Sequence, residues 1–354
     1  MIEKVAAKII AKWLRKGNMA RCMRDILPHS GLGFKEREEV ARIVHDVVRF
    51  KIYYDYVLEK RGLEKEPMNY IALSKEKPEM EALRDIKYSM STELASLTPD
   101  EFIPIINREP DTTLCVNLNK ITREKAIEKL RNEGFEAREY VPETAIIVSS
   151  AGRYSSLIKE GYAIVQDASS QIISKIAASL GKRILDYCAG SGGKSLAMYV
   201  FNPQAEFYAY DINERKLKSL EKRAKKWGMS VRIFHKPYGE FDVVLVDAPC
   251  SGVGAAARNP EAKYEKDFEK YARMQLDILK ESKNIVAKGG YLVYTVCSYT
   301  LSETENVIKK FLKDEDFEVE YVKCEYDEHL KREKYGAYVF AGDVFYISIL
   351  KRSQ

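Results

Sequence analysis

The chain has 354 residues, of which 45% are hydrophobic and 31% charged, and this composition excludes a disordered or fibrous protein. No apolar run approaches the roughly 18 residues of a membrane-spanning helix, and Met1-Ile-Glu-Lys-Val5 shows no signal peptide. We therefore expect a cytoplasmic protein of two or three domains with no membrane partner. The net charge is +5, and residues 1–70 hold fifteen Lys/Arg against ten Asp/Glu. This basic segment favours contact with phosphates, although a solvated helical surface explains the charge equally well.

Helical spacing of apolar residues predicts an all-helical domain over residues 1–98. The expected helices are a first from Val5 that ends at Gly17, a second over 19–27 that Pro28 stops, a third from Phe34 through Tyr54, and a weaker one over 79–97. Most of the aromatic residues in these helices fit a core rather than a nucleic-acid platform.

Residues 99–165 alternate between short strands and helices and predict a small α+β module of the RNA-recognition-motif (RRM) type. The expected elements are strands Thr113–Asn117 and Ala145–Val148 and helices Ile121–Gly134 and Arg153–Lys159. No residue pattern in this module indicates chemistry. Asn117 and Lys120 are either structural residues or RNA contacts.

Residues 166–354 predict a third domain with an α/β fold, a doubly wound Rossmann-like sheet that ends in an antiparallel pair. Its expected strands are Arg183–Tyr187, Phe207–Asp211, Val231–His235, Asp242–Val246, Gly290–Thr295, Phe317–Val322 and Val344–Leu350. Its expected helices are 168–179, Glu214–Trp227, Tyr264–Ala287 and Glu303–Leu312.

A glycine-rich turn, Cys188-Ala-Gly190-Ser-Gly192-Gly193-Lys194-Ser195, joins the first of these strands to a helix. Such a turn lets a ligand approach the backbone closely, and three ligands compete for it. A phosphate-binding loop needs glycine where Cys188 stands, and a dinucleotide fingerprint needs a different glycine spacing. S-adenosylmethionine needs the turn and an acidic residue at the end of the next strand for the ribose, which Asp211 supplies.

Two later strands each end in a cysteine. Asp247-Ala-Pro249-Cys250 follows one strand, and Cys297-Ser298 follows another. Ligands bind beyond the carboxyl ends of strands in open α/β sheets. Two thiols there, beside one carboxyl, can attack a carbon atom and later remove a proton from its neighbour. Either cysteine alone would fit a small buried hydrophobe.

The remaining cysteines, Cys22, Cys115, Cys188 and Cys324, form no CxxC pair, and with only four histidines in the chain we expect neither a metal site nor a disulfide framework.

The chain resembles the RNA 5-methylcytosine methyltransferase family over residues 95–350, in motifs of matching order and spacing. The motifs are Asp186-Tyr-Cys-Ala-Gly-Ser-Gly-Gly-Lys194, Asp211, Asp247-Ala-Pro-Cys-Ser-Gly252 and Tyr294-Thr-Val-Cys-Ser298, with Cys115-Val-Asn117, Gln166-Asp-Ala-Ser169 and Glu303-Thr-Glu-Asn306 as flanking pattern. Residues 33–50 resemble the NusB type of RNA-binding domain, which is typical of the bacterial branch that modifies small-subunit ribosomal RNA.

The resemblance implies roles for the site residues. Cys297 would attack carbon 6 of cytosine, Asp247 would be buried, protonated and bonded to N3, and Cys250 would aid release. Lys194 would favour the thiolate or orient the base. DNA-directed relatives use the thiol at Cys250 as nucleophile instead, so both assignments stay open. The residues implied to bind S-adenosylmethionine are Cys188, Ala189, Gly190, Ser191, Gly192, Gly193, Lys194, Asp211, Arg215, Asp247 and Pro249.

The sequence departs from the family pattern at several positions. Gly190-Ser191 stand for Ala-Pro, Val296 for threonine and Cys115 for arginine, and the loop Phe234–Phe241 lacks the Asp that holds adenine in the family. We expect a monomer that methylates cytosine in ribosomal RNA, with transfer RNA as the alternative substrate. An RNA-binding ribosome-assembly factor without catalysis is the competing hypothesis, and a P-loop nucleotidase is a third that Cys188 argues against.

Overall fold

The computed structural model describes residues 1–313 and 315–354. These residues divide into two compact units. Unit 1 comprises residues 1–108 and 256–266, and unit 2 comprises residues 109–255 and 267–354. The three-domain division with boundaries after residues 98 and 165 stays a prediction.

Unit 1 is helical. Its helices are α1 (Ile2–Lys16), α2 (Met19–Ile26), α3 (Phe34–Arg49), α4 (Lys51–Arg61), α5 (Pro67–Glu76), α6 (Arg84–Lys87), α7 (Thr92–Leu97) and α8 (Ile103–Asn107). The apolar stripes of α1 and α3 meet in one core that includes Ile9, Val44 and Val47. The third predicted helix is interrupted, because Phe50 leaves the helical conformation with φ −116° and ψ 22° and separates α3 from α4.

The segment 256–266 packs among the helices of unit 1, which the sequence did not predict. Glu261 accepts hydrogen bonds from Trp13 Nε1 at 2.8 Å and from the Met19 backbone N–H at 2.9 Å. Lys263 is fully buried and donates to the Tyr88 carbonyl and to Asn107 Oδ1, both at 2.7 Å. The helix predicted from Tyr264 therefore begins only after this segment, as α14 (Phe268–Ser282).

Unit 2 contains a small antiparallel sheet of order β2-β3-β1-β4. Its elements are β1 (Thr112–Val116), α9 (Arg123–Asn132), β2 (Ala137–Glu139), β3 (Ala145–Val148), α10 (Ser156–Glu160) and β4 (Ala163–Val165). This βαββαβ order is that of the split ferredoxin-like unit. Asn117 Nδ2 and Lys120 Nζ donate to the carbonyls of Trp227 and Lys226, at 2.8 and 2.7 Å. Both residues therefore cap the carboxyl end of a helix, which is a structural role.

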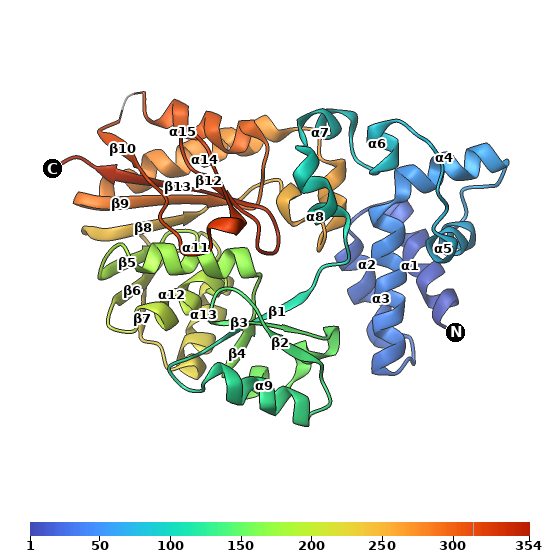
Figure 1. Ribbon diagram of the computed structural model, residues 1–354, viewed down its shortest axis with the longest axis horizontal. Coiled ribbons are helices and arrows are strands. Elements are labelled where there is room, and N and C mark those ends of the chain that lie inside the picture. Colours follow the sequence, from blue (N-terminus) through green and yellow to red (C-terminus); the bar gives the residue numbers. More distant parts are fainter. Residues whose placement is uncertain (314) are drawn as a thin grey trace. The chain divides into compact units, whose positions relative to one another are not determined.

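The large sheet of unit 2 has the order β11-β12-β13-β9-β8-β5-β6-β7, with β10 paired to β13 (Figure 1). Its strands are β5 (Arg183–Asp186), β6 (Glu206–Ala209), β7 (Val231–Ile233), β8 (Phe241–Asp247), β9 (Val286–Val296), β10 (Phe317–Glu320), β11 (Leu330–Arg332), β12 (Ala337–Val339) and β13 (Phe345–Arg352). Strands β5 to β9 are parallel, and β13 runs antiparallel to both β9 and β10. The predicted α/β fold with its final antiparallel pair is confirmed.

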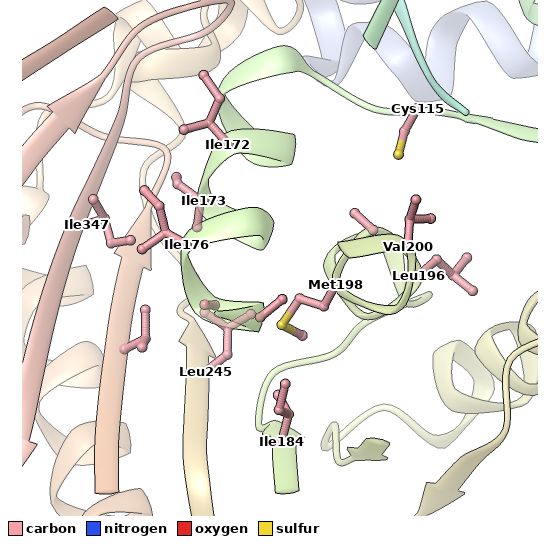
Figure 2. Close-up of a cluster of buried hydrophobic side chains, with 14 of the residues drawn as sticks. Cys115, Ile172, Ile173, Ile176, Ile184, Leu196, Met198, Val200, Leu245 and Ile347 are labelled. Carbon is pink, nitrogen blue, oxygen red and sulfur yellow. The ribbon is translucent and has the colours of Figure 1, made fainter. Parts of the chain in front are cut away.

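Helices cover both faces of this sheet (Figure 1). One face carries α11 (Ala168–Ala178), α12 (Gly193–Phe201) and α13 (Glu214–Trp227), and the other carries α14 and α15 (Glu305–Phe311). Figure 2 shows part of the first layer, where Met198 of α12 points toward Ile184 and Leu245 of the strands and Ile176 of α11 lies beside Ile347 of β13. Burial on both faces explains why these strands are continuous apolar runs.

The position of the site follows from the strand order. The chain places β6 and β7 on one side of β5 and then returns to place β8 and β9 on the other side. In open α/β sheets ligands bind where the order reverses, which in this sheet is beyond the carboxyl ends of β5 and β8. None of the described helices is both long and apolar enough to cross a bilayer.

Candidate active site

The glycine-rich turn after β5 is held by the two neighbouring strands. The backbone N–H of Tyr187 donates to the carbonyl of Leu245 on β8, and that of Ala189 donates to the carbonyl of Tyr210 after β6, at 2.8 and 2.9 Å. Gly190 and Gly192 have φ of 55° and 85°, in the left-handed region that glycine adopts without a steric cost. The turn therefore presents its backbone at the end of the sheet, directly before α12.

Asp211, which the sequence analysis assigned to the ribose of a cofactor, lies beside this turn. Its Oδ2 accepts the backbone N–H of Gly190 at 2.8 Å, and its Oδ1 accepts that of Asn213 at 2.7 Å. Each carboxylate oxygen keeps a second lone pair, so the group can still accept hydrogen bonds from two vicinal hydroxyls. Beside it, Ile212 is 91% exposed and offers an apolar surface to a flat ring. These residues fit a nucleoside.

Arg223 supports the turn from α13, and the sequence analysis missed it. Its Nη1 donates to the carbonyl and the hydroxyl of Ser191, at 2.7 and 3.2 Å. Burial lowers the pKa of Arg223 from its usual value. The residue stands in a run of basic side chains, and no local pattern distinguishes it from its neighbours.

Lys194 and Asp247 form an ion pair across the switch point. Lys194, in the first turn of α12, is 7% exposed and donates from Nζ to Asp247 Oδ2 at 2.7 Å. Its ammonium also lies 4.8 Å from the centre of the Phe345 ring. The Asp247 side chain is 34% exposed, so the expected burial of this carboxyl is only partial. The ion pair holds the Asp247 carboxyl in place, and part of the Asp247 side chain remains accessible to solvent.

The two strand-end cysteines meet. Cys250 Sγ and Cys297 Sγ are 3.1 Å apart as free, partly exposed thiols that share one hydrogen bond. Contact with the Cys297 thiol, and then burial, raise the pKa of Cys250 well above its ordinary value. In the adjacent loops the backbone N–H of Gly254 donates to the carbonyl of Cys297 at 3.0 Å. Strands β8 and β9 are paired with Asp247 opposite Thr295. The loops that follow these two strands therefore bring the two thiols together.

The other predicted cofactor residues differ in their exposure. Ala189, Gly192 and Lys194 are buried, Cys188, Gly190 and Gly193 are partly exposed, and Ser191, Arg215 and Pro249 are exposed. Burial raises the pKa of the Cys188 thiol. The loop 234–241 carries aromatic rings, with Phe234 stacked on Tyr208 at 5.6 Å and in edge contact with Tyr238 at 4.9 Å.

Among the residues that the structure describes, no group of three or more His, Cys, Asp or Glu side chains could hold a metal ion.

Comparison with known proteins places this geometry in a family. Residues 175–351 match the family described as 16S rRNA methyltransferase RsmB/F. The chain belongs to this RsmB/F family.

Curated relatives of this RsmB/F member include ribosomal RNA small subunit methyltransferase B of Klebsiella pneumoniae, which is 31% identical over 60% of this chain and 53% of its own. The protein of Coxiella burnetii that is named a probable ribosomal RNA small subunit methyltransferase B is 30% identical over 71% of this chain and 64% of its own. The chain spans about half the length of the ribosomal RNA small subunit methyltransferase B proteins that it matches.

Solved structures agree with the fold of this RsmB/F chain. The crystal structure of PH0851 has a TM-score of 0.78 and 20% identity over 99% of both chains. The structure of NSun6 from Pyrococcus horikoshii with SFG has a TM-score of 0.62 and 17% identity, over 73% of this chain and 96% of its own. At these identities the likeness concerns the fold alone.

Proposed function

We propose that the chain transfers a methyl group from S-adenosylmethionine to carbon 5 of a cytosine in RNA, with ribosomal RNA as the favoured substrate. The observation that carries the proposal is the contact between two thiols, 3.1 Å apart, at the carboxyl edge of a sheet whose neighbouring strand end holds a glycine turn and Asp211. The names of the relatives support ribosomal RNA over transfer RNA.

The proposed chemistry begins at carbon 6. Cys297 Sγ forms a bond to C6, the proton lost from the thiol is taken up by the Asp247 carboxylate, and Asp247 passes a proton to N3 as the C5–C6 double bond shifts to C4–C5. Lys194 orients that carboxyl through the 2.7 Å hydrogen bond to Oδ2. The addition makes C5 enamine-like and able to accept a methyl group. When bound, S-adenosylmethionine supplies an electrophilic methyl on a sulfonium centre.

Release requires a base for the hydrogen on C5, and Cys250 is placed to act as that base. The Cys297 thiol is the largest cause of the raised pKa of Cys250. Once Cys297 Sγ is bonded to C6, it no longer shares a proton with Cys250, so the pKa of Cys250 should fall when a base is needed. Cys250, as a thiolate, then takes the C5 proton, the Cys297–C6 bond breaks with its electron pair returning to sulfur, and N3 gives its proton back to Asp247, which restores the aromatic ring.

The target base has to leave its stack to reach these groups, and looped or single-stranded RNA lowers that cost. The basic segment 1–70 would bind the surrounding phosphates. We further propose that the chain acts in the cytoplasm and as a monomer. Sedimentation with and without RNA would test the oligomeric state.

Incubating RNA with two cysteine variants tests the assignment. We expect Cys250→Ala to accumulate a covalent RNA adduct, visible as a shifted band on a denaturing gel, because addition proceeds and release does not. Cys297→Ala should form no adduct. The opposite pattern would assign the nucleophile to Cys250.

Titration with S-adenosylmethionine separates the enzyme from a catalytically inactive ribosome-assembly factor, since a factor of that kind has no need to bind the cofactor. Bisulfite sequencing of ribosomal and transfer RNA from a deletion strain identifies the modified cytosine.

A further inference from the structure

A buried carboxylate, Glu303, lies where the loops that follow β8 and β9 meet, and its side chain is fully buried. Its Oε1 accepts hydrogen bonds from the Ser251 backbone N–H at 2.8 Å and from Gln275 Nε2 at 3.1 Å. Its Oε2 accepts from the hydroxyls of Ser251, Ser298 and Thr300, at 2.6, 2.7 and 3.0 Å. One side chain therefore accepts five hydrogen bonds.

The partners of Glu303 are the immediate neighbours of both thiols. Ser251 follows Cys250 in the chain, and Ser298 follows Cys297. Consecutive Cα atoms are about 3.8 Å apart, so a contact that fixes one residue also restricts the next. The carboxylate of Glu303 thus joins the two cysteine loops to each other at the positions beside their sulfur atoms.

The loop of Cys250 is also held on its other side. Gln275 Nε2, from α14, donates to the Pro249 carbonyl at 3.0 Å as well as to Glu303. Cys250 is consequently flanked by two anchored residues. The backbone of Glu303 is itself fixed, because the hydroxyl of Tyr294 on β9 donates to its carbonyl at 2.6 Å. The anchor therefore rests on a strand and a helix of the scaffold.

A carboxylate is suited to this task. Hydrogen bonds to an ionised acceptor are shorter and about twice as strong as neutral ones. A buried carboxylate that lost these partners would be strongly unfavourable, so the arrangement resists any separation of the two loops. Hydroxyls without the carboxylate have several alternative orientations and would hold the loops less firmly.

We propose that Glu303 is a positioning residue that keeps the Cys250 and Cys297 loops together, so that the two thiols remain in contact for the successive steps of addition and release. The consequence for catalysis rests on the proposed function. The consequence for thiol geometry does not, and it can be measured without any methyl transfer.

Two substitutions at Glu303 differ in what they leave behind. In Glu303→Gln the amide oxygen can accept from Ser251 N–H and Gln275, and the amide nitrogen can donate to hydroxyls, which accept as well as donate. In Glu303→Ala all five hydrogen bonds to the side chain of residue 303 are lost. We expect kcat to fall about 100-fold in Glu303→Ala, because that is the scale of a small displacement of reacting groups. In Glu303→Gln we expect kcat to fall by less than about tenfold. The KM for S-adenosylmethionine should stay the same, because the side-chain hydrogen bonds of Glu303 go to the cysteine loops and α14.

Disulfide formation measures the thiol contact directly. Oxidised glutathione takes the two thiol hydrogens and two electrons, so that one Cys250–Cys297 disulfide and two glutathione molecules form. Mass spectrometry of the intact chain and its peptides then follows the cross-link. We expect rapid cross-linking in the wild type, a rate about tenfold lower in Glu303→Ala, and most of the rate restored in Glu303→Gln.

Glu305→Ala is the matched control. Glu305 accepts from the Tyr335 backbone N–H and the Tyr346 hydroxyl. It stands two residues from Glu303, but its hydrogen bonds go to Tyr335 and Tyr346 and not to the cysteine loops. Its loss should therefore lower Tm and leave the cross-linking rate unchanged. If Glu303→Ala does not fold, the double variant Ser251→Ala, Ser298→Ala removes two of the hydroxyl bonds and should slow cross-linking in the same direction.

An unchanged cross-linking rate in folded Glu303→Ala would overturn the proposal, as would equal slowing in Glu305→Ala. Slower cross-linking in Glu303→Ala, in a chain that transfers no methyl group, would support the positioning role and overturn the proposed function.

Discussion

Asp186 ends β5 with a carboxyl that is almost fully removed from solvent. The residue is 1% exposed, Oδ2 accepts the Ser195 hydroxyl at 2.6 Å, and Oδ1 is buried without a hydrogen-bond partner in the described part of the chain. Burial raises the pKa of Asp186 to about 7, helped by the charge of Asp247 and opposed by the hydrogen bond from Ser195 and the charge of Lys194. The folded chain thus holds this proton far above the pH at which an unfolded Asp releases it.

The pH dependence of stability follows from this raised pKa. Between the ordinary value of 3.8 and about 7 the folded state binds one proton more than the unfolded state, so this group lowers stability as pH rises through that window. We expect Asp186→Asn to increase the free energy of unfolding relative to the wild type, by about 2–3 kcal/mol more at pH 8 than at pH 5. Urea unfolding at the two pH values measures this, and a difference independent of pH would contradict it.

At the scale of elements, the glycine turn depends on two glycines for different reasons. A Cβ on Gly190 would meet nothing within 4 Å, so only its φ of 55° opposes a side chain. A Cβ on Gly192 would lie 2.6 Å from Leu220 Cγ on α13, in addition to a φ of 85°. The second glycine is therefore also required for the packing of the turn against a helix.

These two positions should respond differently to alanine. We expect Gly190→Ala to lower the free energy of unfolding by about 1–2 kcal/mol, the cost of the left-handed conformation. Gly192→Ala should cost about 1–3 kcal/mol more, through the contact with Leu220. A double-mutant cycle with Leu220→Ala should recover much of that excess in urea unfolding. Equal losses in the two single variants would show that the close contact has no energetic weight.

At the scale of the whole molecule, the chain passes from one unit to the other three times, after residues 108, 255 and 266. The segment 256–266 is joined to the helices of unit 1 by hydrogen bonds of Arg49 to the Ala257 carbonyl, of Trp13 to Glu261 and of Lys263 to Asn107. Burial lowers the pKa of Lys263 well below its usual value, with the charge of Arg49 as a smaller cause. The peptide bond between residues 108 and 109 is therefore not the only connection of unit 1 to the rest of the chain, because residues 256–266 belong to unit 1 as well.

Cleavage at the first of these crossings tests that arrangement. With a protease site inserted between Arg108 and Glu109, we expect the two fragments to elute together in gel filtration after cutting, because residues 256–266 stay packed in unit 1. A variant with Glu261→Ala and Lys263→Ala removes the hydrogen bonds of these two side chains to Trp13, Met19, Tyr88 and Asn107, and it should release the N-terminal fragment at lower urea concentration. Immediate separation of the unmutated fragments would refute the prediction.

Much of the fold was predictable because its signals are local. The parallel strands are apolar runs between turns, and strands of a parallel sheet share one carboxyl edge, so Asp247, Cys250 and Cys297 could be assigned to one site. The strands β2, β4, β11 and β12 have three residues each and are too short for a periodicity. The break at Phe50 was not predicted, since its apolar side chain continues the helical stripe.

The sequence by itself determined the layered α/β fold and the residues that end its strands, because hydrophobic periodicity and turn residues act within a few positions of the chain. Only the tertiary structure decided which groups touch: the hydrogen bond between the thiols, Arg223 on the turn, and Glu303 between Ser251 and Ser298. Such contacts join residues far apart in the chain, and packing selects them among many polar side chains of equal local character.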